Sequence, residues 1–165
     1  MNSSVPAPDG DLCSIAASLG VLGEKWTLLV LREAFSGIRR FEDMLQRTGA
    51  PRQVLSARLA RLVDEGILRR VPYREAGQRQ RAEYRLTDKG LDLYPILVAL
   101  MHWGDRWAIQ TAVPPLTLHH RGCGAEVGLQ LRCAAGHDLA GARDVQPLPA
   151  EPAQPGRPRL AARSG

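Results

Sequence analysis

The chain has 165 residues, which is enough for one ordinary domain with an appendage and for a core that needs no metal or disulfide. Its formal net charge is +5, which favours an acidic partner such as nucleic acid, although an arginine-rich composition is also typical of GC-rich genomes. Three widely spaced cysteines exclude a disulfide framework, and we expect a cytoplasmic protein because the polar residues 1–10 resemble no signal peptide. The longest apolar run, 26–31, is far shorter than the roughly 20 residues of a membrane span, so no membrane partner is expected.

Three helices are expected in the first part of the chain. Apolar residues at helical spacing, broken at Gly20 and Gly23, predict a short helix over 13–19 and a buried helix over 25–35. A third helix is predicted over 41–46, before a turn.

A fourth helix is expected to open at Pro51, whose missing N–H does no harm in a first turn, and to end at Glu65 before Gly66. Leucines recur on its inner face at positions 55, 59 and 62. The helical wheel therefore turns the intervening polar and small residues outward.

A hairpin follows this helix, because the apolar spacing changes from helical to alternating. Ile67, Val71 and Tyr73 share one strand face, and Tyr84 and Leu86 share another. The intervening residues form a polar loop, so the hairpin has a basic tip.

The last regular element predicted is a helical segment. Thr87 followed by Asp88 signals a helix start, and Pro95 either kinks the segment 91–110 or starts a new helix. Apolar residues recur along one side of it: Ile96, Leu100, Trp103 and Trp107. A single small domain leaves such a stripe little to cover, so a second subunit is expected to pack on it.

This order of elements predicts an α+β, mainly helical fold: a winged helix-turn-helix with a two- to three-stranded wing and a C-terminal dimerisation helix. We expect a flexible N-terminus over 1–10 and a DNA-binding and dimerisation domain over 11–112. A small Cys/His-containing segment should occupy 113–145, and the Pro-rich residues 146–165 should form a disordered tail.

Individual residues also resemble those of a known family. The resemblance rests on Cys13, the Arg40-Phe41 pair and four runs: LGEKWTLLVLRE at 22–33, LSARL at 55–59, EGIL at 65–68 and YRLTDKG at 84–90. Together they closely resemble the HxlR-type family of transcription regulators, relatives of the MarR regulators. The resemblance implies a homodimer that binds operator DNA, while Pro51 at the head of the recognition helix and the long tail depart from the commoner pattern.

On that resemblance, the first turns of the fourth helix enter the major groove. Gln53 then faces an adenine edge, Ser56 a base or phosphate, and Ala57 a thymine methyl. Arg52 reaches guanine or the backbone, and Arg61 belongs to the same outward face. The alternative is a polar face that is simply solvated.

The predicted wing carries Arg74, Arg79 and Arg81, which we interpret as phosphate or minor-groove contacts rather than solvated loop residues. Arg39 and Arg40 precede the third helix. They either contact the DNA backbone or cap a strand edge.

Two further residue groups have open interpretations. Cys13 is either a small buried residue or, as the resemblance implies for several members, a sensor of oxidants or electrophiles. Lys25 and Trp26 suggest a ligand site, but an aromatic residue among leucines is more often core.

The segment after Pro114 is rich in Cys and His. Cys123, Cys133, His137 and one of His119 or His120 could bind zinc, which suits tetrahedral N/S ligation. The spacing is poor, because a knuckle brings two cysteines within two to four residues. A small metal-free hairpin is the alternative, and no other cofactor is expected.

The sequence thus predicts a DNA-binding transcriptional repressor that acts as a homodimer on a near-palindromic operator and responds to an oxidant, an electrophile or a small ligand. A protein-interaction module with a vestigial wing is the alternative. The sequence has no nucleophile elbow, phosphate-cradling loop, zinc-protease helix or facing carboxylate pair, so an enzyme is not expected.

Overall fold

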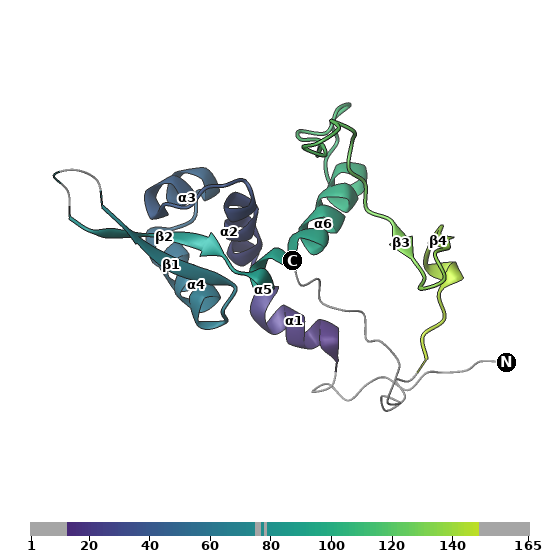
Figure 1. Ribbon diagram of the computed structural model, residues 1–165, viewed down its shortest axis with the longest axis horizontal. Helices are drawn as coiled ribbons and strands as arrows, with labels where there is room; N and C mark the ends of the chain where they lie inside the picture. The colour runs from purple at the N-terminus through teal and green to yellow at the C-terminus, as the bar shows by residue number, and fades with distance from the viewer. Residues whose placement is uncertain (1–12, 75–76, 78, 149–165) are drawn as a thin grey trace. The chain divides into compact units, whose positions relative to one another are not determined.

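The computed structural model describes residues 13–74, 77 and 79–148, which divide into two compact units between Leu129 and Gln130. The first unit contains four helices, then a hairpin, then two helices (Figure 1). The elements are α1 (Ser14–Leu22), α2 (Lys25–Phe35), α3 (Phe41–Thr48), α4 (Arg52–Asp64), β1 (Leu68–Tyr73), β2 (Arg81–Leu86), α5 (Asp88–Leu91) and α6 (Tyr94–Trp107). This is the predicted winged helix-turn-helix.

The helix α2 is the centre of the first unit, and it contacts α1, α3, α4, α6 and β2. Its residues Val30 and Leu31 are fully buried, and Trp26 packs against the core as expected. The other buried residues of the core come from α1, α3, α4, the two strands and the adjoining loops: Leu22, Met44, Ala50, Leu55, Leu59, Leu62, Ile67, Leu68 and Tyr84. Each large buried side chain contributes about 1.5–3 kcal/mol, so this cluster stabilises the packing of α3 and α4 against α2.

The turn between α3 and α4 depends on one glycine. Gly49 has a φ of +66°, and its N–H donates to the carbonyl oxygen of Leu45 at 3.1 Å, which ends α3. Pro51 is the N-cap of α4, so the helix itself begins at Arg52, one residue after the predicted start. The helix α3 extends to Thr48, two residues past the prediction, because the left-handed glycine and not the last apolar residue terminates it.

The first helix is longer than predicted. It continues through Gly20 to Leu22 instead of ending at residue 19, so the expected end was wrong. A glycine within a helix costs only about 1 kcal/mol, and burial of Leu22 offsets it. Gly23 then ends the helix with its N–H bonded to the carbonyl of Leu19 at 2.7 Å.

The strands β1 and β2 form an antiparallel hairpin that extends beyond α3 and α4 (Figure 1). The register pairs Leu68 with Leu86 and Tyr73 with Arg81. The segment before α3 joins this sheet, since the N–H of Tyr84 donates to the carbonyl of Arg39 at 2.8 Å. The wing therefore has two full strands and a third, bridging segment, in agreement with the expected two to three strands.

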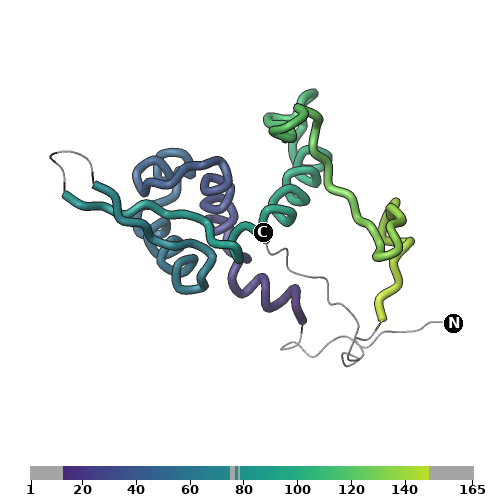
Figure 2. Tube along the Cα trace, viewed as in Figure 1, coloured from purple at the N-terminus to yellow at the C-terminus, as the bar shows by residue number. Residues whose placement is uncertain are grey.

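A short helix, α5, and a longer one, α6, follow the wing. Thr87 caps α5 as predicted, because its Oγ1 accepts from the N–H of Gly90 at 3.1 Å. A Cβ on Gly90 would lie 2.3 Å from the carbonyl oxygen of Ile67, so only glycine fits there. A new helix, α6, then starts near Pro95 and leads away from the α1–α4 body (Figure 2).

The second unit is a small hairpin of β3 (Leu131–Arg132) and β4 (Asp138–Leu139), followed by a short helix, η2 (Ala142–Asp144). Near the end of the first unit, an isolated bridge joins His119 to Glu126. The predicted flexible N-terminus and residues 149–165 of the predicted tail lie outside the described residues, and the boundary at 112 stays a prediction. No single described helix is long and apolar enough to span a membrane; α1 and α2 meet that test only as a pair bent by 79°.

Candidate nucleic-acid interface

The outer face of α4 is arranged as the sequence predicts. Leu55, Leu59 and Leu62 point into the core and are at most 1% exposed. The N-terminal positions predicted to meet DNA are all exposed: Arg52, Gln53, Ser56 and Ala57. The first two turns of α4 thus present a guanidinium, an amide, a hydroxyl and a methyl to the outside, which are the groups that read base edges in a major groove.

Arg61, also assigned to this face by sequence, has partners within its own chain. Its Nη2 donates to the carbonyl oxygen of Gly20 at 2.9 Å and lies 3.7 Å from a carboxylate oxygen of Glu65. It sits about 13 Å along the helix axis from Arg52, at the opposite end of α4. A DNA contact by Arg61 stays a prediction.

Arg52 makes a two-point ion pair at the start of α4. Its Nη1 and Nη2 donate to the two carboxylate oxygens of Glu42 at 2.9 and 2.8 Å, and its guanidinium lies 5.3 Å from the ring centroid of Phe41. Hydrogen bonds from Arg52 hold the pKa of Glu42 below its usual range, and the same bonds raise the pKa of Arg52. Both groups are therefore ionised at neutral pH.

The wing adds positive charge beside α3 and α4. Arg74, Arg79 and Arg81 are exposed as predicted. A hollow of about 740 Å³ separates the hairpin from the start of α3, and three arginines line it together with two tyrosines and the acids Glu42 and Asp43. Those arginines are Arg40, Arg70 and Arg81.

Arg70 of β1 is the member of this hollow that sequence reasoning missed. Its guanidinium lies 5.8 Å from the ring centroid of Tyr84. The Arg69-Arg70 pair beside the predicted wing was the available signal. Arg40 similarly lies 4.8 Å from the ring centroid of Tyr73, while the backbone of residues 39–40 bonds to β2. The strand-edge interpretation of this segment therefore holds for the backbone, and a side-chain contact with DNA stays a prediction.

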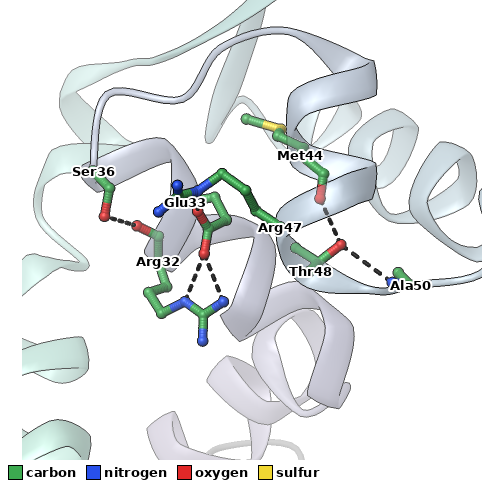
Figure 3. A network of polar contacts seen from close by, with 7 residues as sticks. All are labelled: Arg32, Glu33, Ser36, Met44, Arg47, Thr48 and Ala50. Atoms are coloured by element: carbon green, nitrogen blue, oxygen red, sulfur yellow. Dashed lines mark hydrogen bonds and ion pairs between the residues drawn. The ribbon is translucent and has the colours of Figure 1, made fainter. Parts of the chain in front are cut away.

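A buried carboxylate holds α3 against α2 (Figure 3). Glu33 is 2% exposed, and it accepts hydrogen bonds from Nε of Arg32 at 2.8 Å and Nε of Arg47 at 2.5 Å. Burial raises the pKa of Glu33, but the bonds and charges of both arginines outweigh burial and lower it overall. Sequence reasoning missed this clamp, although the Arg32-Glu33 pair directly after the apolar run at 28–31 was a signal.

The stripe on α6 is open to solvent in the single chain. Ile96, Leu100, Trp103 and Trp107 are 43%, 47%, 62% and 66% exposed, respectively. An apolar hollow of about 620 Å³ lies beside the stripe, between α2, α6 and residues 115–118. Sequence reasoning did not find this hollow, because its walls come from three distant segments.

The cysteines are free thiols. Cys13 is the half-buried N-cap of α1, at the helix start where the sequence places it. His120 Nδ1 lies 3.2 Å from Cys123 Sγ, and His137 Nδ1 lies 3.6 Å from Cys133 Sγ.

Of the two histidines left open by sequence, His120 is thus the one beside a cysteine. The ring nitrogens of His119 instead pair with Thr117 Oγ1 and the Gly124 carbonyl. Within residues 13–74, 77 and 79–148, no three His, Cys, Asp or Glu side chains gather as metal ligands. Each described pair falls short of the four ligands that structural zinc takes, so zinc stays a prediction.

Known proteins share both the sequence and the fold. The chain is 43% identical over 136 residues to the uncharacterized HTH-type transcriptional regulator Rv3095 of Mycobacterium tuberculosis, covering 82% of this chain and 85% of that one. The solved structure of PA1607, a candidate transcription factor, superposes with a TM-score of 0.74 at 37% identity and covers 84% of this chain and 96% of that one. The redox regulator HypR in its reduced form follows with a TM-score of 0.51 at 26% identity, covering 57% and 92%.

Residues 21–112 match the family described as HxlR-like helix-turn-helix, more than half of the chain. The relatives are DNA-binding transcriptional regulators and not enzymes. The chain therefore belongs to the HxlR-like helix-turn-helix family of transcriptional regulators.

Proposed function

We propose that this protein is a sequence-specific repressor that binds a near-palindromic operator as a homodimer. The observation that carries the proposal is the exposed N-terminal face of α4 beside an arginine-rich hairpin. In a winged helix-turn-helix such a face enters the major groove, and the wing lies over the adjacent backbone or minor groove.

A twofold dimer would place two α4 helices about 34 Å apart, in successive major grooves on one side of the duplex. The exposed apolar stripe on α6 supports a self-partner, because a large uncovered apolar surface is unusual in a monomer. Repression follows when the bound dimer blocks polymerase, and a DNA target puts the protein in the cytoplasm.

The test is selection of binding sites from randomised DNA duplexes, followed by affinity measurements. Gln53→Ala should weaken discrimination between the selected site and random DNA by about 1–3 kcal/mol, because it removes a base contact. Arg79→Ala, the control on the wing, should weaken binding to both DNAs alike and lower the salt slope by about one. Equal losses for both variants on both DNAs would contradict this assignment of roles, and failure to select any site would favour the protein-interaction module.

We also propose that the repressor responds to a signal. Cys13 at a helix N-cap supports an oxidant or electrophile, and the apolar hollow beside α6 supports a small ligand instead. A thiol oxidant should abolish operator binding by the unaltered protein, whereas Cys13→Ser should still bind after the same treatment. That pair of results would identify an oxidant as the signal.

A further inference from the structure

The side chain of Arg52 is held from two sides by its own chain. The carboxylate of Glu42 pairs with both terminal nitrogens, at 2.9 and 2.8 Å, and so fixes the end of the guanidinium. The ring centroid of Phe41 lies 5.3 Å from the central carbon of the Arg52 guanidinium, and this contact restrains the plane of the guanidinium. Arg52 is the first residue of α4, so this guanidinium is anchored at the end of the recognition helix that is predicted to meet DNA.

The pair leaves one set of donors available. A guanidinium has five N–H groups, and its end edge and its side edge each present two parallel donors. Glu42 occupies the end edge. The side edge, which consists of Nε–H and one N–H of the adjacent terminal nitrogen, has no partner in the described part of the chain. Two parallel N–H groups match the O6 and N7 acceptors of guanine in the major groove.

On the basis of the DNA-binding function proposed above, we propose that Glu42 is a specificity-determining residue that positions Arg52 to read a guanine. Phe41 supports the same guanidinium by stacking. Glu42 itself contacts no base, and it acts through the orientation of Arg52.

The carboxylate of Glu42 also disfavours contact between Arg52 and the phosphates of DNA. An unrestrained arginine reaches phosphate oxygens, which give affinity without sequence information. Glu42 fills the end edge and places a negative charge where a phosphate would approach. The pair is ionised at neutral pH, because mutual hydrogen bonds lower the pKa of Glu42 and raise that of Arg52.

The neighbouring acid provides a matched control. Asp43 is also exposed and also lies in the first turn of α3, but it has no hydrogen bond or ion pair to Arg52. Glu42→Ala and Asp43→Ala change the net charge by the same amount, so both should raise affinity for random DNA by electrostatics alone. Only Glu42→Ala should change which base is preferred.

The experiment selects binding sites from randomised DNA duplexes with the full-length protein and with three variants: Arg52→Ala, Glu42→Ala and Asp43→Ala. We expect Arg52→Ala to lose a guanine preference of about 5- to 100-fold at one position of each half-site. Glu42→Ala should lose most of the preference at that same position, whereas Asp43→Ala should keep it. Circular dichroism checks that each variant is folded.

Three results would overturn the inference in distinguishable ways. If Glu42→Ala keeps the preference that Arg52→Ala loses, Arg52 reads guanine without positioning by Glu42. If Arg52→Ala changes no position, Arg52 is not a base reader, although the protein still binds a specific site. If the unaltered protein selects no site, the proposed function fails, and the inference fails with it.

Discussion

At the scale of single residues, the clamp around Glu33 decides how α3 is held. Arg32 comes from the same helix as Glu33, whereas Arg47 comes from the last turn of α3, so the carboxylate joins the two helices (Figure 3). A buried carboxylate is stable only while it is paired. This one charge therefore adds a polar contact to the apolar packing that holds α3, the helix before the recognition helix, against α2.

Replacing Glu33 with Gln should destabilise the protein by roughly 1–3 kcal/mol at pH 7, below the usual loss for a buried pair because both arginines are half exposed. The pKa of Glu33 is lowered in the folded state. The clamp therefore makes its full contribution to folding stability above about pH 4.3, the pKa of a glutamate in the unfolded chain. Its contribution disappears as the pH falls through the lower pKa of the folded state.

Urea denaturation at several pH values measures this effect. The difference in unfolding free energy between the unaltered protein and Glu33→Gln should shrink as the solution is acidified below about pH 4. Glu42→Gln is the control, because its exposed ion pair should contribute far less to stability. A difference that is constant from neutral to acid pH would show that Glu33 does not stabilise the fold as a carboxylate.

At the scale of elements, the turn between α3 and α4 sets the angle of the recognition helix. Gly49 has a positive φ there, and a Cβ at this position would meet no atom within 4 Å. The cost of a side chain is therefore backbone strain alone, with no contribution from crowding.

We expect Gly49→Ala to destabilise the protein by about 1–2 kcal/mol in a urea titration, since alanine is strained in the left-handed region. Gly20→Ala is the matched change within α1, where the space is equally open and the backbone is helical. It should stabilise the protein by about 0.5–1 kcal/mol. Shifts in the same direction for the two variants would show that the conformation of Gly49 is not what ends α3.

The elements were largely predictable from the sequence because each depends on local spacing. The leucine spacing gave the buried face of α4, and Thr87 with Asp88 gave the start of α5. What the sequence could not show are pairs between distant segments. The bond from Arg61 to Gly20 spans 41 positions, and the clamp from Arg47 to Glu33 spans 14. Local patterns contain no information about such partners, so an outward position on a helical wheel did not reveal what Arg61 contacts.

At the scale of the whole molecule, the proposed mechanism depends on a dimer. The four residues of the α6 stripe are large apolar side chains that are 43–66% exposed in the single chain, and Gly104 lies between the two tryptophans in the sequence. Burying such a stripe at about 25 cal/mol per Å² could contribute several kcal/mol to association after the entropic costs. An acidic residue in the middle of the stripe should therefore prevent dimerisation.

Leu100→Glu would place an unpaired carboxylate in the interface twice, once from each subunit, if the stripe lies across the twofold axis. The variant should be monomeric by light scattering while keeping its helical circular dichroism, and its operator affinity should fall steeply because each half-site is bound alone. Leu91→Glu is the control, because Leu91 is similarly exposed, at 52%, but lies on α5 away from the stripe. A folded Leu100→Glu protein that still forms dimers would show that the stripe is not the dimer interface and that another surface, such as α1 with its exposed Ile15 and Leu19, joins the two copies.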